Sequence, residues 1–119
     1  MAAGPCFLVA EDPAPPGALL GFARYGQFRS GQGYARSMEH TIILSPAASG
    51  RGIGRRLMAA IEDHARASGI HLMIGAVSGE NPDGRAFHEA VGYRLMGTIP
   101  AAGFKFGRHL DLWLLGKLL

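Results

Sequence analysis

A glycine-rich loop between an apolar strand and a long amphipathic helix restricts the fold of this chain more than any other feature. The β-branched run 40–44 ends before Pro46, because proline cannot donate to the hydrogen-bond ladder of a sheet. Three glycines then alternate with other residues: Gly50, Gly52 and Gly54. Apolar residues at helical spacing predict a helix over 54–68, and the nearly continuous apolar run 71–77 predicts a strand buried on both faces. The sequence therefore predicts a βαβ unit with a parallel strand pair.

The rest of the chain predicts further strands around this unit. Strands are expected over 7–10, 19–28, 93–99 and 110–118, loops over 30–37 and 78–84, and a short helix over 85–91. The proline-rich stretch 12–17 predicts a turn between the first two strands. With 119 residues, of which 48% are hydrophobic and 18% charged, the chain suits one domain over 1–119 with a single core.

The composition also excludes several classes of protein. No apolar run approaches the roughly 20 residues that span a bilayer, so no membrane association is expected. The N-terminus lacks the pattern of a secretory signal, so the expected compartment is the reducing cytoplasm and Cys6 is expected to be a free thiol. One cysteine and scattered histidines lack the spacing of metal ligands, so no metal is expected.

The positive charge of the chain is gathered at the start of the long helix. The formal net charge is only +3, but Arg51, Arg55 and Arg56 lie within or directly after the glycine loop. A helix N-terminus disfavours cations and attracts anions, so a bound polyanion would offset this arrangement. The loop is either a phosphate site or a tight turn with solvated arginines, and its spacing fits neither a Walker loop nor a dinucleotide fingerprint. Charge confined to one helix end also argues against a nucleic-acid partner.

Several motifs together resemble one group of enzymes. Gly52 and Gly54 match the glycines of a Gln/Arg-x-x-Gly-x-Gly/Ala pattern, with Ser49 in place of the Gln or Arg. The further matches are Glu39 before the run 42–44, Asn81, the segment Phe87-His88-Glu89-Ala90-Val91-Gly92-Tyr93, and Ala102-Gly103-Phe104-Lys105-Phe106-Gly107-Arg108 followed by Asp111. On these residues the stretch 20–119 resembles the phosphinothricin and methionine sulfoximine acetyltransferase group of the GNAT superfamily.

This resemblance implies a fold and a co-substrate. The implied fold is α/β (α+β), with a mixed, largely antiparallel central sheet and a βαβ acyl-CoA-binding core. Members of the group open with a further strand and two helices that form one wall of the acceptor pocket, so an N-terminally shortened domain is expected. The implied co-substrate is acetyl-CoA, held by the main chain of Ile42, Ile43 and Leu44, by Gly50, Arg51, Gly52, Ile53, Gly54 and Arg55, and by Asn81. The alternative to cofactor binding is that Asn81 caps its loop.

The same resemblance implies the catalytic roles. A protonated amine cannot attack a thioester, so a base is required, and Glu39 stands in its place. The alternative for Glu39 is a surface carboxylate at a strand entry. His88 stands in the place of the acid that protonates the departing CoA thiolate, and otherwise it lines its helix beside the cofactor. His40 flanks the base and is a candidate for its water network.

The loop before Glu39 corresponds to the acceptor side of the group. Phe28, Arg29 and Tyr34 are the implied substrate-binding residues, and Arg29 or Arg36 would pair with an acceptor carboxylate unless the loop is simply solvated. The resemblance also implies a homodimer. Two functions remain open: an N-acetyltransferase for the primary amine of a small amino-acid-like acceptor of the phosphinothricin or methionine sulfoximine type, and a catalytically impaired module that binds acetyl-CoA or another CoA ester.

Overall fold

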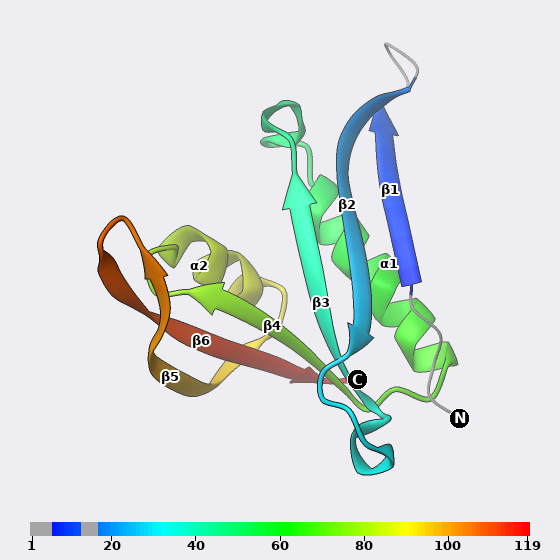
Figure 1. The fold of residues 1–119 in the computed structure, drawn as a ribbon. Coiled ribbons are helices and arrows are strands. Elements are labelled where there is room, and N and C mark those ends of the chain that lie inside the picture. Colours follow the sequence, from blue (N-terminus) through cyan, green and yellow to red (C-terminus); the bar gives the residue numbers. More distant parts are fainter. Residues whose placement is uncertain (1–5, 13–16) are drawn as a thin grey trace.

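One mixed sheet with two helices makes up the fold. The structure, a computed structural model, describes residues 6–12 and 17–119, so most of the turn predicted at 12–17 lies outside the described residues. The strands are β1 (Cys6–Asp12), β2 (Ala18–Gln27), β3 (Ser37–Leu44), β4 (Leu72–Ser78), β5 (Arg94–Lys105) and β6 (Arg108–Leu118), and the helices are α1 (Ile53–Ala67) and α2 (Pro82–Ala90). The strand order is β1-β2-β3-β4-β6-β5, with β3 and β4 parallel and the other neighbours antiparallel (Figure 1). The predicted fold class, including its βαβ core, is confirmed.

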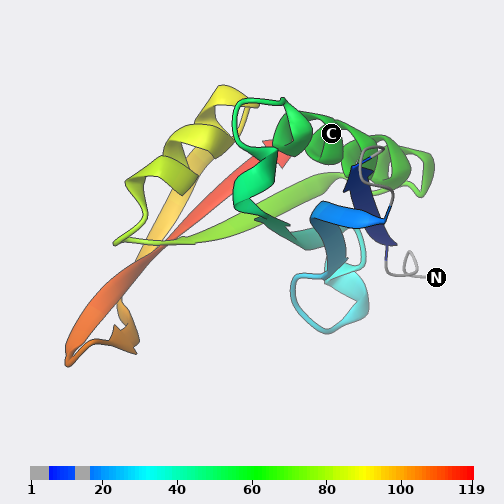
Figure 2. The ribbon, with the colours of Figure 1, turned by 90° about the horizontal axis from the view of Figure 1, so that it is seen from above.

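Both helices cover the same face of the sheet (Figure 2). α1 packs against β1, β2 and β3, while α2 packs against β4. The apolar residues of α1 that were expected to face the core are buried: Leu57, Met58, Ile61 and Ala65. On the opposite face of β1, β2 and β3, apolar side chains remain exposed: Phe7, Val9, Leu19 and Ile43. The hydrophobic core therefore lies between α1 and the sheet, and it extends to Met73 and Val77 of β4 and to Leu115 of β6.

The C-terminal hairpin is longer than the sequence predicts. β5 and β6 meet in a turn at Phe106 and Gly107, beyond the predicted strands 93–99 and 110–118. The two turn residues have φ angles of 55° and 73°, as type I′ hairpin turns require. Phenylalanine is uncommon at positive φ, so the sequence carries no ordinary turn signal at this point. The predicted strand ends were therefore too short.

The second helix begins earlier than the sequence predicts. α2 starts at Pro82, inside the segment expected to be a loop over 78–84. Asn81 caps the helix, because its Oδ1 accepts a hydrogen bond from the Gly84 N–H at 2.9 Å. Proline suits the first helical position, where an N–H would have no partner within the helix. The Asn-Pro pair thus starts a helix rather than a turn.

β3 and β4 pair only at their beginnings. Ser37–His40 of β3 pair with Leu72–Gly75 of β4, and the two strands then separate (Figure 1). β3 continues to Leu44 beside β2, while β4 continues to Ser78 beside β6. The sheet is therefore divided into two halves that share a ladder only at one end.

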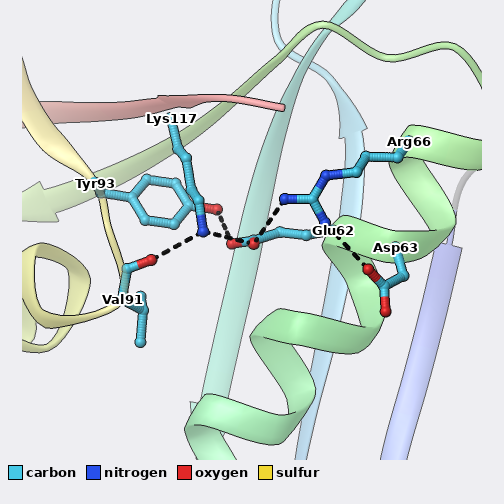
Figure 3. A network of polar contacts seen from close by, with 6 residues as sticks. All are labelled: Glu62, Asp63, Arg66, Val91, Tyr93 and Lys117. Atoms are coloured by element: carbon cyan, nitrogen blue, oxygen red, sulfur yellow. Dashed lines mark hydrogen bonds and ion pairs between the residues drawn. The ribbon is translucent and has the colours of Figure 1, made fainter.

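A buried carboxylate connects α1 to the second half of the sheet. Glu62 is 4% exposed, and its Oε2 accepts a hydrogen bond from the Tyr93 hydroxyl at 3.0 Å. Lys117 of β6 donates to Glu62 Oε1 at 2.8 Å and to the Val91 carbonyl at 3.0 Å (Figure 3). Burial, together with the charge and hydrogen bond of Glu62, raises the pKa of Tyr93, so this phenol remains a donor. The network links α1 to β6 at the end of the sheet where β3 and β4 are still paired, since Lys117 stands beside Met73 of that ladder.

Replacing Lys117 with Met should lower the free energy of unfolding by roughly 2–3 kcal/mol, because the buried Glu62 carboxylate loses its closest cation. Urea denaturation measures this change. Arg66→Met is the matched control, since the Arg66 side chain is 45% exposed and lies 3.8 Å from the same carboxylate, and its loss should cost under about 1 kcal/mol. Equal losses for the two variants would contradict the role given to Lys117.

Candidate functional site

A cavity of about 480 Å³ occupies the region where β3 and β4 separate. It is lined by Glu39, His40, Thr41, Ile42 and Leu44 of β3, by Gly75, Ala76, Val77 and Ser78 of β4, and by Asn81, Asp83, Gly84, Phe87 and His88 on or beside α2. Successive side chains of a strand point to opposite faces of the sheet. Consecutive β3 residues line this cavity, so it is bordered from both faces.

Backbone groups of β3 reach the cavity without a partner strand. Successive residues of a strand direct their N–H and C=O groups to opposite neighbours. The Ser45 N–H donates to the Leu20 carbonyl at 2.8 Å, so the Ile43 main chain also faces β2. Ile42 and Leu44 face the other side, where the pairing with β4 has ended. The structure therefore brings the main chain of Ile42 and Leu44 to the cavity and leaves Ile43 outside its lining.

Glu39 lies one residue before the end of the β3–β4 ladder. It is half-buried, and it stands beside Ile74 in the register of the two strands. Among the described residues, no hydrogen bond or ion pair engages its carboxylate. His40, the next residue, directs its side chain to the opposite face of the sheet. Glu39 and His40 thus border the same cavity from two sides.

Two buried histidines meet on the helix side of the cavity. The Nε2 atoms of His40 and His88 are 2.9 Å apart, and the side chains are 4% and 7% exposed. Burial and the neighbouring His88 lower the pKa of His40 to about 3, so the His40 ring is neutral near pH 7. A Cβ atom at Gly75 would lie 2.8 Å from His40 Cε1 and 2.9 Å from His88 Nε2. The glycine in β4 therefore makes room for the pair.

The family motif predicts His88 at the site, but no sequence pattern predicts its contact with His40. The two residues are 48 positions apart, and only the packing of α2 on β4 brings them together. Gly75 within an otherwise apolar strand was the available signal, because such a glycine often marks a close approach by another group.

The two alternatives for Asn81 are compatible in the structure. Asn81 caps α2 through Gly84 and also lines the cavity. A side chain at Gly84 would collide with the Asn81 amide, so glycine leaves room for the capping side chain.

The glycine loop presents a set of unpaired donors at the start of α1. In the part of the chain that the structure describes, no acceptor pairs with the N–H groups of Gly50, Gly52, Ile53, Gly54 and Arg55. Gly50 and Gly52 adopt φ angles of 73° and 71°, which glycine tolerates without strain. Arg51 differs, because its N–H donates to the Ala48 carbonyl and its guanidinium pairs with Asp12 at 3.0 Å. The loop geometry thus favours an anion site over a tight turn with all arginines solvated.

The predicted acceptor residues lie apart from the cavity lining. Phe28, Arg29 and Tyr34 belong to the segment between β2 and β3, and all three are exposed. The Arg29 guanidinium carbon lies 5.4 Å from the centre of the Tyr34 ring, a cation–π distance. None of the three lines the cavity that contains Glu39. Their substrate-binding role stays a prediction.

Neither a metal-ligand cluster nor a membrane-spanning helix is present within residues 6–12 and 17–119. No three His, Cys, Asp or Glu side chains gather there as metal ligands. No helix in these ranges combines the length and the hydropathy needed to cross a bilayer.

Comparison with known proteins places this geometry in a family. Residues 1–93 match the acetyltransferase (GNAT) family. The chain belongs to this family. It is 38% identical over 105 residues to an L-methionine sulfoximine/L-methionine sulfone acetyltransferase of Pseudomonas aeruginosa, and 34% identical over 109 residues to a phosphinothricin N-acetyltransferase of Streptomyces coelicolor. The GNAT phosphinothricin acetyltransferase of Sinorhizobium meliloti, solved in complex with acetyl-CoA, superposes with a TM-score of 0.86 at 37% identity. The predicted resemblance is confirmed.

This GNAT chain is shorter than the proteins it matches. The two alignments cover 88% and 92% of this chain, but 60% and 64% of the relatives. The superposition likewise covers 95% of this chain and 60% of the Sinorhizobium chain. The chain thus spans about three-fifths of the length of these relatives.

The low pKa of His40 predicts acid destabilisation of the fold. Between pH 6.5 and about 3 the unfolded state binds a proton at His40 and the folded state does not, so the free energy of unfolding falls as pH is lowered. One such group contributes at most about 1.4 kcal/mol per pH unit. His40→Gln removes this contribution, so the difference in stability between wild type and variant should narrow from pH 7 to pH 4.5 in urea denaturation. His71→Gln, at an exposed side chain, is the control. A difference that stays constant with pH would contradict the buried, neutral His40.

Proposed function

We propose that this chain transfers the acetyl group of acetyl-CoA to the primary amine of a small amino-acid-like acceptor. One observation carries the proposal: a half-buried carboxylate and unpaired strand amides border the same cavity. The carboxylate is Glu39, and the amides are those of Ile42 and Leu44. Acyl transfer needs both, because an amine must lose a proton and a thioester oxygen must be stabilised as it gains charge.

The donor would be held between two sets of amides. The unpaired N–H groups at the start of α1 suit the pyrophosphate of CoA, because they join hydrogen-bond donors to the positive end of the helix dipole. Gly54 sits where this helix approaches the cavity, since a Cβ there would lie 3.0 Å from Leu44 Cδ1 and 3.1 Å from Phe87 Cε1. A cofactor bound at the loop would therefore reach the cavity along the end of β3. The acetyl-CoA complex of the Sinorhizobium relative supports this co-substrate.

The reaction would proceed by direct attack of the amine on the thioester. Glu39 accepts a proton from the ammonium group, and the neutral amine adds to the carbonyl carbon. The N–H groups of Ile42 and Leu44 face the oxygen that becomes negative. When the C–S bond breaks, sulfur leaves with the electron pair and takes a proton. The products are an amide and free CoA, and one proton is released to solvent.

The acceptor class rests on the relatives. Those in Pseudomonas and Streptomyces are named for methionine sulfoximine, methionine sulfone and phosphinothricin. Phe28, Arg29 and Tyr34 are the residues of this chain that we expect to meet such an acceptor. A homodimer and a cytoplasmic location are part of the same proposal. Exposed Phe104 and Phe106 at the β5–β6 turn are side chains that a second copy would cover.

A module that binds CoA esters without turnover is the second candidate. The position of the expected acceptor residues favours it, because Phe28, Arg29 and Tyr34 lie outside the lining of the cavity that contains Glu39. Thiol release separates the two. With acetyl-CoA and methionine sulfoximine, methionine sulfone or phosphinothricin, the enzyme should release free CoA in proportion to the acetylated amine. If acetyl-CoA raises the melting temperature but none of these amines causes thiol release, the chain is the binding module and not the enzyme.

Glu39→Gln should reduce turnover by about 10²- to 10⁴-fold, because the amide cannot accept the ammonium proton. The affinity for acetyl-CoA, measured by titration calorimetry, should stay within about twofold. Glu89→Gln removes the same charge from an exposed position on α2 and should retain full turnover. Full activity of Glu39→Gln would remove Glu39 as the base.

Gly52→Ala should weaken acetyl-CoA binding by at least about tenfold. Alanine is strained at φ 71°, at a cost of roughly 1–2 kcal/mol, and its methyl group would project from the surface that presents the amides. Gly107→Ala is a matched control, because Gly107 has φ 73° and equally open space but lies in the hairpin turn. Both variants should lose similar stability. The loop is not the phosphate site if both bind acetyl-CoA equally well.

A further inference from the structure

The hydrogen bonds of His88 fix which of its nitrogens carries a proton. Nδ1 of His88 lies 2.7 Å from the Gly84 carbonyl oxygen, which can only accept. Nδ1 must therefore be the protonated nitrogen, and in the neutral ring Nε2 is left as an acceptor. The atom facing this acceptor is Nε2 of His40, at 2.9 Å.

The same reasoning then fixes the state of His40. Because His88 Nε2 accepts, the Nε2 of His40 must be the donor, and in a neutral His40 ring this leaves Nδ1 without a proton. Nδ1 of His40 is buried and has no hydrogen-bond partner among the described residues. A buried acceptor without a partner is costly, by roughly 1–3 kcal/mol. The residue lines the cavity, so a reactant or a water molecule there is the available source of a donor.

Both nitrogens of His88 are thus occupied within the protein, whereas His40 retains one vacant acceptor. We propose that His40 and His88 act as a single proton relay, in which Nδ1 of His40 exchanges protons with the reactants and His88 stores the proton. This assignment rests on the proposed acetyl transfer, and it moves the point of proton exchange from His88 to His40.

The relay is balanced over one turnover. After the amine adds to the thioester, an N–H proton of the adduct moves to His40 Nδ1. The Nε2–H bond of His40 breaks as an Nε2–H bond forms on His88, which becomes the cation. The transfers reverse when the C–S bond breaks, and the departing sulfur receives the proton from His40 Nδ1. The pair ends as it began, while Glu39 takes the first proton of the ammonium group.

The surroundings of the pair allow one extra proton and disfavour two. Two cations with their nitrogens 2.9 Å apart would repel strongly. The Tyr93 ring packs against both imidazoles, at 5.3 Å from His40 and 5.5 Å from His88, and its hydroxyl is turned to Glu62. Phe87 contacts His88 at 5.4 Å between ring centres. Two carboxylates border the same cavity: Glu39 from the opposite face of the sheet, and Asp83 from α2.

The tautomers can be measured on the wild-type chain without any assay of activity. Nitrogen-15 NMR of the imidazoles should find His40 protonated at Nε2 and bare at Nδ1, and His88 protonated at Nδ1. On acidification from pH 8 to pH 5 the pair should take up no more than one proton. A His40 protonated at Nδ1 in the neutral state, or two protons taken up independently, would overturn the relay.

A double-mutant cycle tests the relay in turnover. His40→Gln keeps an N–H donor for His88 but has no acceptor nitrogen at the Nδ1 position and does not titrate. His40→Gln and His88→Gln should each lower kcat by about 10²-fold, and the double variant should lose no more than either single one. Acetyl-CoA affinity should stay within about twofold, and His71→Gln should keep wild-type turnover. The pH dependence of kcat should flatten in His40→Gln.

The outcomes separate the relay from the proposed function. Losses that multiply in the double variant, or a wild-type pH profile in His40→Gln, would show that the two histidines act independently and overturn the relay while leaving acetyl transfer intact. A wild-type chain without thiol release overturns acetyl transfer, and the NMR tautomers then decide the state of the pair by themselves.

Discussion

The separation of β3 from β4 after four paired residues is the constraint on which the site depends. A strand that loses its neighbour leaves backbone donors and acceptors without partners, and each such buried group costs roughly 1–3 kcal/mol. Here the groups of Ile42 and Leu44 open onto a cavity rather than into a dry core. The local loss of sheet structure is therefore also the source of the site's polar backbone. Glu39 and His40 reach the cavity because they stand at the end of the ladder.

The division of the sheet requires another means of holding its halves together. α1 packs mainly on β1, β2 and β3, and its apolar side chains share one buried cluster with Met73 and Val77 of β4 and Leu115 of β6. Glu62 on its inner side accepts from Tyr93 and from Lys117 of β6, and it thereby connects the helix to the second half (Figure 3). Directed polar contacts suit this position, because they fix distance and orientation where apolar packing alone would permit sliding. The connection between the two halves thus lies on the helix side of the sheet.

Local patterns were sufficient for the βαβ core and insufficient for the site's inner contacts. The helix predicted over 54–68 lies at Ile53–Ala67, because its apolar period is long and regular and a glycine follows it. The hairpin ends were missed because Phe106 stands at a positive φ where a type I′ turn usually has Asn, Asp or Gly. The His40–His88 contact was missed for a different reason. It joins a strand to a helix 48 residues away, and the sequence around each histidine gives no sign of the other. The motifs of a family therefore located His88 and Glu39, whereas the partner of His88 required the fold.

Consecutive residues of β3 border the cavity, and their side chains point to opposite faces of the sheet. Groups on both faces therefore reach the place where β3 and β4 have separated. The glycine loop lies on the side of the helices. Glu39 and Thr41 point to the other face, because they alternate with His40 along β3. Under the proposed acetyl transfer, acetyl-CoA would approach from the face with the helices and the amine from the face with Glu39, so both could be bound at once. The fold would then not fix the order in which the two proposed reactants bind. Under the same proposal, the two reactants would not compete for a common entrance, because the sheet separates their routes.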